Sequence, residues 1–589
     1  MATQDPQSYA DRSQGQIKHI DLKIHPDFSS KTFEIEARYQ LDRPVSGSFY
    51  LDTHALDIRQ ASAGGQPLEW ELDEEHALIG RRLHLKNLDS LSEFTLAVNT
   101  SPEAQALQWT DSVQTAGGEH PFLFSQCQSI HARSLFPCQD TPSVRFTYTA
   151  EIQAPLPLTA VMAAENTGVH QQGEGRIFHF RMPQAIPSYL FALAIANLEF
   201  REVGPRTGIY AEPETIEAAA WEFADMENMV VEAEKLLGPY LWDRFDALVL
   251  PPSFPYGGME NPRLTFLTPT LILGNRSQTG VVIHELAHSW TGNLVTNATW
   301  EHIWLNEGWT TYAEMRIREV LEGVEEAKLE DAYYAARMVR ILDQFGWDSE
   351  ITQLRQFLTR DSNFMSSQIP YFKGRFFLGK IEEAVGRERF DEFIQVYMQR
   401  YQFQSLTSEE FLAFMEAELP GIGEKVDIQQ WIYQPGLPEG GDKAPSELYD
   451  QVLKAVDGYK NGALPTEDRI AAWSYGQKVA FLEALPKEIP LEDCRKIDEL
   501  FDLKNNPDGS ALVPFFVCSL NAGDEAILPR VEEFLGRIGR MLYINPLYQA
   551  LFMNSWSQKH GKRIFEQNRS RYHPIAAGLV DRRLKEAGL

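Results

Sequence analysis

The sequence predicts a multidomain α+β protein: an N-terminal β domain, then a mixed α/β domain, then a C-terminal all-α domain. Three observations lead to this prediction. At 589 residues the chain is too long for one hydrophobic core. Apolar and polar residues alternate with period two in parts of the first two hundred residues, and helical periodicity dominates after a Gly- and Pro-rich stretch at residues 436–445.

The N-terminal domain is placed at residues 1–199. Residues 33–41 and 144–152 both alternate apolar and polar side chains, which predicts half-buried strands. Gly, Asp and Asn turns separate such segments, so we expect antiparallel sheets arranged as a saddle or sandwich. The sequence shows no long helical pattern before about residue 213.

The second domain is placed at residues 200–436, where the pattern becomes mixed. Residues 214–237 are rich in helix formers and end at Gly238-Pro239, which predicts one helix. Residues 245–250 predict a short strand, and helices are expected from the following motif region to about residue 435.

Residues 437–446 are taken as a linker and residues 447–589 as the all-α domain. Tyr449, Leu453 and Val456 fall at i, i+4 and i+7, which predicts the buried side of an amphipathic helix. Ala480, Leu482 and Leu485 indicate another helix. No exact repeat supports the helical superhelix that we expect here.

Composition excludes several classes of protein. The net charge of −29 argues against nucleic acid as a partner, because phosphates would be repelled. The four cysteines form no Cys-x-x-Cys pair, so a cysteine metal site is not expected. The N-terminus lacks a basic-then-apolar signal, and no stretch approaches the ~18 apolar residues of a membrane helix. We therefore expect a cytoplasmic protein without a membrane partner.

The strongest chemical signal is the run His-Glu-Leu-Ala-His at residues 284–288, with Glu307 downstream. Histidines at i and i+4 lie on one face of a helix, so His284, His288 and Glu307 could hold one Zn²⁺ and leave a position open. Glu285 stands where it could reach a zinc-activated water as general base. The alternative is a chance match, which the flanking signals for a helix disfavour: Ser277 or Thr279 could serve as N-cap and Gly292 as C-terminal stop.

Upstream, residues 257–261 read Gly-Gly-Met-Glu-Asn. Together with the histidine motif and Glu307, this sequence resembles the gluzincin zinc aminopeptidases, the alanyl aminopeptidase and leukotriene A(4) hydrolase family. Residues 126–131, 137–143 and 290–293 are similar to a bacterial-type aminopeptidase of the leukotriene A(4) hydrolase branch. The resemblance implies a thermolysin-like catalytic domain, one zinc per chain, a monomer, and removal of the N-terminal residue from short peptides.

The same resemblance implies roles for further residues. Glu260 matches the glutamate that binds the substrate amine, with Gln128 as a second contact and Gln126 beside it. Tyr256 and Met259 match positions that line the first side-chain pocket. Tyr371 matches the tyrosine that hydrogen-bonds the oxyanion. Arg540 matches an arginine that reads the substrate's C-terminal carboxylate; its alternative is a surface charge.

Two further expectations come from the residues themselves. Gly257 and Gly258 lack side chains, so an extended peptide could approach their backbone. Glu314 lies two helical turns beyond Glu307 and is a candidate acceptor for a ligand histidine, or else an ordinary surface carboxylate.

The sequence also departs from the leukotriene-processing relatives. An aspartate and a tyrosine before the oxyanion tyrosine correspond to Asn363 and Ser366, and a lysine after the carboxylate-reading arginine corresponds to Leu542. The leading hypothesis is therefore a zinc aminopeptidase. A bifunctional aminopeptidase and lipid epoxide hydrolase is disfavoured by Asn363 and Ser366, and a catalytically silent binding scaffold is disfavoured by the intact motif.

Overall fold

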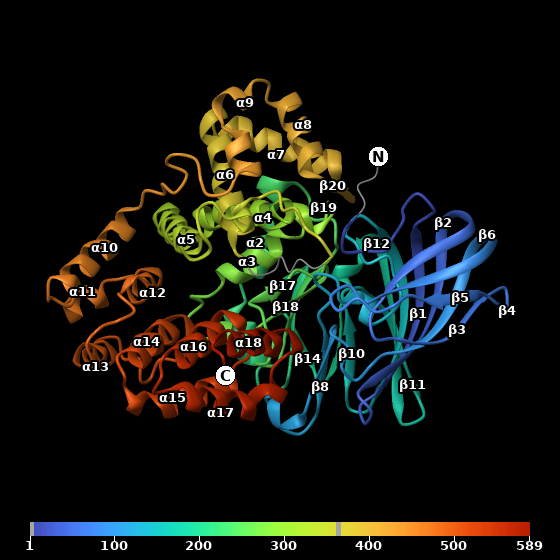
Figure 1. Cartoon of the computed structure of the whole chain (residues 1–589), viewed down its shortest axis with the longest axis horizontal. Coiled ribbons are helices and arrows are strands. Elements are labelled where there is room, and N and C mark those ends of the chain that lie inside the picture. The colour runs from blue at the N-terminus through green and yellow to red at the C-terminus, as the bar shows by residue number, and fades with distance from the viewer. Residues whose placement is uncertain (1–4, 361–366) are drawn as a thin grey trace.

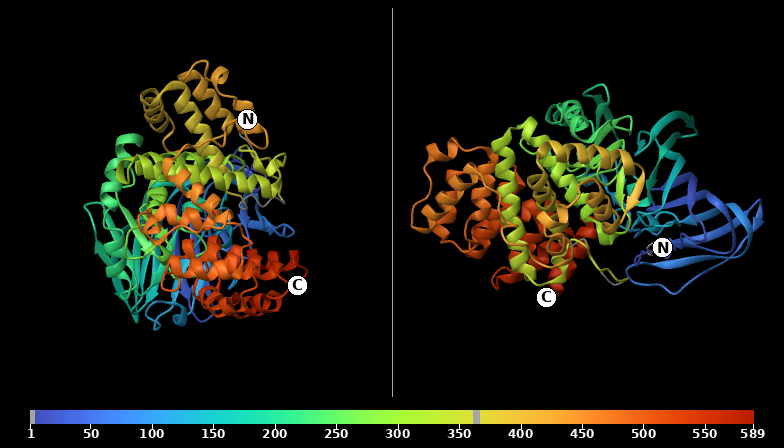
Figure 2. Two further views of the ribbon diagram at one scale, coloured as in Figure 1. Left: turned by 90° about the vertical axis from the view of Figure 1, so that its left-hand side faces the viewer. Right: turned by 90° about the horizontal axis from the view of Figure 1, so that it is seen from above.

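The computed structural model of the chain describes residues 5–360 and 367–589. An N-terminal β domain, a central α/β domain and a C-terminal helical domain follow in the predicted order. The blue strands lie at one end of the molecule and the orange helices of residues 447–500 at the other, with the green and yellow segments between them (Figure 1). The view from above shows the same succession (Figure 2).

The β domain is built on a nine-stranded sheet in the order β11-β12-β9-β1-β2-β6-β3-β4, with β5 paired to β6. Its strands are β1 (Ile17–Asp27), β2 (Thr32–Thr53), β3 (Asp57–Ala63), β4 (Gln66–Pro67), β5 (Glu69–Leu72), β6 (Arg81–Asn99), β9 (Arg145–Pro155), β11 (Glu165–Gln172) and β12 (Gly175–Pro187). Alternate side chains of β2 and β9 are buried, which confirms the two predicted strands.

One pair in this sheet differs from the antiparallel expectation. β1 and β9 run parallel, with Ile20 opposite Tyr148. Parallel neighbours need a long connection, which β2 to β8 supply here. Local alternation of side chains does not encode this pairing, because it is the same for both strand directions.

A second sheet has four strands in the order β10-β13-β8-β7, and these strands alternate along the chain with strands of the large sheet. Its strands are β7 (Leu107–Thr110), β8 (Phe122–Ser125), β10 (Thr159–Met162) and β13 (Leu193–Ala196). All four residues of β8 are buried. The loop that leaves β8 carries Gln126 and Gln128, so this sheet fixes where those two amides lie.

The central domain contains a mixed five-stranded sheet in the order β14-β15-β16-β18-β17. The strands are β14 (Glu199–Glu202), β15 (Thr207–Ala211), β16 (Phe245–Val249), β17 (Gly258–Met259) and β18 (Leu264–Leu267). β16 is the strand predicted at residues 245–250. β17 is a short edge strand antiparallel to β18, and it presents the Gly-Gly-Met-Glu segment at the edge of the sheet.

The helices of the central domain are α1 (Ile216–Glu222), α2 (Met226–Leu237), α3 (Gly280–Ala287), α4 (Trp304–Leu321), α5 (Val324–Phe345), α6 (Ile369–Val385), α7 (Arg387–Tyr401), α8 (Ser408–Glu418) and α9 (Ile422–Lys425). Of these, α1 contacts β14 and β15, and α3 contacts β17 and β18. The single helix predicted at residues 214–237 is two helices. Phe223 leaves the helical conformation and is fully buried at the break.

The motif helix α3 is shorter than predicted. It ends at Ala287, with His288 as the C-cap, whereas Gly292 lies beyond it in a turn with φ of +115°. Thr279 precedes the helix, but its hydroxyl donates to Arg276 O and does not cap it. The turn leads into β19 (Val295–Asn297), which pairs with β20 (Gln404–Leu406), two strands in a region where only helices were predicted.

The C-terminal domain has a hydrophobic core of its own. Its helices are α10 (Glu447–Lys460), α11 (Glu467–Ala471), α12 (Tyr475–Ala484), α13 (Leu491–Leu500), α14 (Gly509–Asn521), α15 (Leu528–Arg537), α16 (Met541–Met553), α17 (Gln558–Asn568) and α18 (Pro574–Glu586). The predicted buried side of α10 is partly wrong: Val452 and Val456 are buried, whereas Leu453 is 41% exposed. Within residues 5–360 and 367–589, no helix is both long and apolar enough to cross a membrane.

Candidate active site

Three predicted metal ligands lie together at the centre of the molecule. His284 comes from α3, His288 from its C-cap and Glu307 from the first turn of α4. Oε2 of Glu307 lies 3.5 Å from Nε2 of His284 and 3.3 Å from Nε2 of His288. Two ligands of a tetrahedral Zn²⁺ bound at ~2.05 Å are separated by ~3.3 Å, so this spacing matches a zinc site.

The other nitrogen of each imidazole faces an acceptor. Nδ1 of His284 lies 2.9 Å from Oε2 of Glu314, and Nδ1 of His288 lies 3.0 Å from the carbonyl oxygen of Thr291. Because a carbonyl can only accept, Nδ1 of His288 carries the proton and Nε2 is free to bind a metal. Glu314 therefore lies where it can accept a hydrogen bond from His284, as expected from its helical spacing. It is 3% exposed, so it is not an ordinary surface carboxylate.

Glu307 itself supports the fit to a metal. Its Oε2 is buried and has no hydrogen-bond partner among the residues that the structure describes. Burial opposes ionisation, but the imidazoles of His288 and His284 beside it lower the pKa of Glu307 to about 2. A buried carboxylate oxygen that stays ionised and faces two imidazole nitrogens is a suitable ligand for zinc.

Glu285 lies beside this cluster on α3 and is 7% exposed. Burial raises its pKa to about 7, although the charges of His284 and His288 oppose the rise. Gly258 of β17 packs directly against it. A carboxylate with a pKa close to neutrality is suited to take up a proton and release it again near pH 7.

Glu260 forms a second buried acidic position close to the metal cluster. One ligand atom each from Glu260, Glu285 and His288 lie within 4.8 Å of one another. Nε2 of Gln128 donates to Oε1 of Glu260 at 3.0 Å, and Nδ2 of Asn293 donates to its backbone oxygen at 2.6 Å. Burial raises the pKa of Glu260, and the negative charge of Glu307 adds to this effect while His288 opposes it.

Gln126 takes a different position from Gln128. Its Nε2 lies 3.1 Å from the sulfur of Met259, and its Oε1 is buried without a partner among the described residues. Gln126 therefore contacts Met259, which was predicted to line the pocket for the first side chain and is 2% exposed. Tyr256, the other residue predicted to line that pocket, is half-buried. The structure thus brings both amides to the Gly-Met-Glu segment, but only Gln128 contacts the glutamate.

Tyr371 lies in the first turn of α6. Its hydroxyl donates to Oε1 of Glu307 at 2.8 Å, and its ring stacks on His284 with centroids 5.9 Å apart. Burial, with the charge of Glu307, raises the pKa of Tyr371 well above its usual value, so the hydroxyl stays protonated. A Cβ atom at Gly308 would lie 2.8 Å from Cα of Gly374. The two glycines therefore let α4, which carries Glu307, cross closely over α6, which carries Tyr371.

Arg540 is buried, which excludes the surface-charge alternative. Its Nη1 donates to Oγ1 of Thr270 at 3.2 Å and to the hydroxyl of Tyr543 at 3.0 Å. A Cβ atom at Gly257 would lie 2.8 Å from its Nη2. Arg540 of the C-terminal domain therefore lies against Gly257, the first residue of the Gly-Gly-Met-Glu-Asn segment that carries Glu260.

Sequence reasoning missed two residues of this site. The hydroxyl of Thr310 lies 3.0 Å from Nδ1 of His288 and donates to Thr291 O at 2.8 Å. Asn293 holds the backbone of Glu260. Thr310 is one helical turn after Glu307, so helical spacing could place it beside that ligand, whereas its contact with His288 depends on how α3 packs on α4. Asn363 and Ser366 lie outside the described residues.

Comparisons with known proteins identify the family of the chain. Residues 14–190 match the Peptidase M1 N-terminal domain, residues 222–432 the Peptidase family M1 domain, and residues 473–584 the Leukotriene A4 hydrolase C-terminal domain. Leukotriene A-4 hydrolase of Xenopus laevis is 36% identical over 601 residues, covering 98% of each chain. The chain belongs to peptidase family M1.

Other relatives of this M1 chain include leucine aminopeptidase 2 of Aspergillus terreus, which is 36% identical and covers 98% of each chain. The solved structure of yeast LTA4 hydrolase in complex with bestatin is 30% identical with a TM-score of 0.89, covering 99% of this chain and 97% of that one. The M1 protein described here is a zinc-dependent metallo-aminopeptidase.

Proposed function

We propose that this M1 aminopeptidase removes the N-terminal residue of short peptides, with Glu285 as general base and Glu260 as the anchor for the substrate's ammonium group. The observation that carries the proposal is that two clusters share His288: His284, His288 and Glu307 on one side, and Glu260, Glu285 and His288 on the other. An ammonium group held by Glu260 therefore places the first peptide bond next to the metal ligands.

Each residue has a definite task in this proposal. Glu260, positioned by Gln128, pairs with the charged amine, and the segment of Gly257 and Gly258 leaves room for the extended peptide. When bound by the three ligands, zinc lowers the pKa of water and polarises the scissile carbonyl. Glu285 takes up a proton and delivers it to the leaving amine. The hydroxyl of Tyr371 donates a hydrogen bond to the carbonyl oxygen as it becomes negative.

The positions beyond the scissile bond fit short substrates. Arg540 supplies a buried guanidinium beside Gly257, which suits the C-terminal carboxylate of a peptide a few residues long. Met259 and Tyr256 line the pocket for the first side chain. We further propose that the enzyme acts as a monomer in the cytoplasm, where its four free and buried thiols suit a reducing environment.

The test is the substitution Glu285→Gln, assayed by release of p-nitroaniline from leucyl-p-nitroanilide. Glutamine keeps the shape but cannot accept a proton, so we expect a loss of at least about a hundredfold in kcat. Zinc content should stay at one per chain, which separates loss of the base from loss of the metal. Near-normal turnover with zinc bound would remove Glu285 from the mechanism.

Epoxide hydrolysis is the second candidate function, because two of the similar proteins are named leukotriene A4 hydrolase. Asn363 and Ser366, in place of an aspartate and a tyrosine, speak against it. Incubation with a conjugated triene epoxide tests it: stereospecific enzymatic diol would overturn the preference for a peptidase alone.

A further inference from the structure

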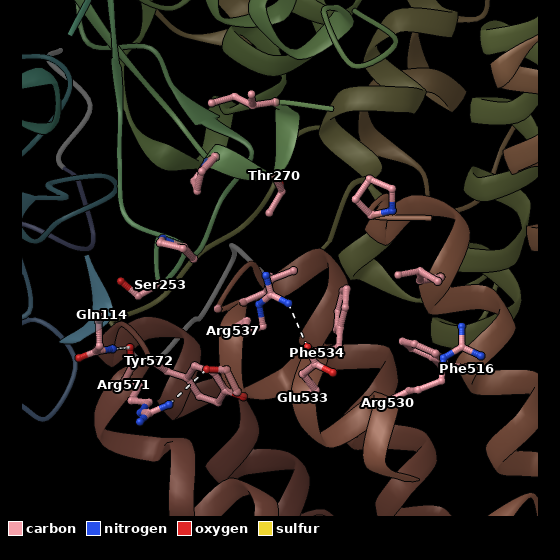
Figure 3. A pocket seen from close by; sticks show the side chains of 18 of the residues that line it. Gln114, Ser253, Thr270, Phe516, Arg530, Glu533, Phe534, Arg537, Arg571 and Tyr572 are labelled. Carbon is pink, nitrogen blue, oxygen red and sulfur yellow. Dashed lines mark hydrogen bonds and ion pairs between the residues drawn. The ribbon is translucent and has the colours of Figure 1, made fainter. Parts of the chain in front are cut away.

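A cavity of about 640 Å³ is lined by residues from all three domains (Figure 3). The N-terminal domain contributes Gln114, the central domain Ser253 and Thr270, and the C-terminal domain most of the remaining wall. Nε2 of Gln114 donates to the backbone oxygen of Arg571 at 3.1 Å and closes one side. A volume in this range is typical of sites for small organic ligands.

This cavity is separate from the proposed substrate site but shares a wall with it. The backbone N–H of Gly539 donates to Pro252 O, and that of Met541 donates to Pro255 O, both at 2.8 Å. Gly539 lines the cavity, whereas the next residue, Arg540, points its guanidinium to Gly257. The metal ligands, Glu260, Glu285 and Tyr371 are not among the residues that line the cavity.

The wall is rich in positive charge. Four cations line it, Lys504, Arg530, Arg537 and Arg571, against one carboxylate, Glu533. Arg537 is neutralised by Glu533 at 3.0 Å, and Arg530 pairs with Asp498 at 2.8 Å. In the part of the chain that the structure describes, neither Lys504 nor Arg571 forms an ion pair. In a chain with a net charge of −29, two unpaired cations at one cavity favour an anionic ligand.

A buried serine lies at one edge of the cavity. Ser253 is 6% exposed and lines the cavity, and its Oγ has no hydrogen-bond partner among the described residues. The oxygen itself is shielded from the cavity, so a ligand would reach it only after the side chain rotates. In Figure 3, Ser253 lies on the same side of the cavity as Gln114 and Arg571.

The remaining surface is apolar. Phe516, Phe534 and Leu512 line the side formed by α14 and α15, and Val113, which is 79% exposed, stands at the rim. A fully hydrated inorganic ion would not use these contacts. We propose that the cavity binds a small organic anion, in which a carboxylate or phosphate group meets Arg571 and Lys504 while an aromatic or aliphatic body packs on the phenylalanines.

The probes are phenyl phosphate and 3-phenylpropionate, compared with the neutral 3-phenylpropionamide. Binding is measured by titration calorimetry on the zinc enzyme saturated with leucine hydroxamate, whose hydroxamate and amine occupy the metal and amine positions. We expect saturable binding of at least one anion and at least tenfold weaker binding of the amide. The stronger of the two anions identifies the preferred head group.

Variants locate the binding. The double substitution of Lys504→Gln and Arg571→Gln changes exposed side chains and should weaken the anion at least tenfold, because it removes two charged hydrogen-bond donors. Lys559→Gln on α17 is the matched control and should change nothing. The proposal is overturned if neither anion binds the hydroxamate-saturated enzyme at millimolar concentration, or if the double variant binds the anion as tightly as the wild type does.

Discussion

Gly258 lies directly against the side chain of Glu285: a Cβ atom at position 258 would fall 2.5 Å from both Cγ and Oε1 of that glutamate. No carbon atom can occupy such a position without displacement of the carboxylate or of β17. The absence of a side chain at Gly258 therefore has two consequences. It leaves room for an extended peptide, and it leaves room for the side chain of Glu285, the proposed general base.

The first prediction is that Gly258→Ala lowers kcat by about a hundredfold, since a shift of about 1 Å in a catalytic group can cost that much. Steady-state assays with leucyl-p-nitroanilide, together with zinc analysis, measure it. Gly257→Ala is the matched control, because its Cβ would meet Nη2 of Arg540 instead, at 2.8 Å. The control should raise KM for tripeptides and leave the aminoacyl reporter almost unchanged. Equal kcat losses in both variants would contradict this division of roles.

The second prediction concerns Glu314, whose Oε2 lies 2.9 Å from Nδ1 of His284. Glu314→Ala removes the acceptor that orients this imidazole, so zinc affinity should fall by about 10- to 100-fold. Competition with a chelator measures the affinity, and added zinc should restore activity. Arg318 pairs with Glu314 at 3.4 Å and with Glu322 at 2.9 Å. The control Glu322→Ala therefore removes an ion pair of Arg318 and leaves the contact of Glu314 with His284 in place. An equal loss of zinc affinity in that control would assign the effect to Arg318.

The third prediction is that Tyr371→Phe lowers kcat by about 100- to 1000-fold, the usual cost of losing one oxyanion donor. The hydroxyl also donates to Oε1 of Glu307, so zinc content must be measured beside the rate. Tyr312→Phe removes another buried hydroxyl that donates to a glutamate, Glu382, remote from the metal, and should leave kcat near the wild-type value. A Tyr371→Phe enzyme with full zinc and full kcat would exclude the assigned role.

The fourth prediction is a pH dependence of stability that comes from Lys373. Its Nζ is buried and donates to the backbone oxygens of Thr352 and Gln434 at 3.0 and 2.8 Å, and burial lowers its pKa from 10.5 to about 7. Between those two values the unfolded chain binds more protons than the folded one, so the stability contributed at this site rises with pH.

The measurement is the melting temperature of the wild type minus that of Lys373→Met, by calorimetry from pH 6.5 to 9. We expect this difference to grow as the pH rises above about 7, because neutral Lys373 no longer carries a buried charge. Lys380→Met, on the same helix but with a partly exposed side chain, should give a difference that does not depend on pH. A flat difference for Lys373→Met would show that the lysine stays charged in the folded protein.

The sequence was most informative where chemistry depends on local spacing. The i, i+4 histidines could be predicted because α3 fixes them relative to one another, and the position of Glu314 could be predicted because α4 fixes it relative to Glu307. The parallel pairing of β1 with β9, the β19–β20 pair and the contact of Thr310 with His288 depend on segments distant in the chain or on side-chain rotamers. Periodicity also could not place Leu453 outside the core of α10, because i, i+3 and i, i+4 spacings define overlapping sides of a helix.

The last prediction uses the position where the resemblance fails. Leu542 follows Arg540 in the first turn of α16, is 40% exposed, and stands where the leukotriene-processing relatives have a lysine. An exposed ion pair is worth about 0.2 to 1 kcal/mol, so Leu542→Lys should lower KM for tripeptides by about 1.5- to 5-fold. The gain should shrink at high salt and vanish for tripeptide amides, because only a free carboxylate can pair with the new charge. Leu542→Gln, which adds polarity without charge, is the control. A gain that is equal for acids and amides would show that the lysine acts on something other than the substrate's C-terminus.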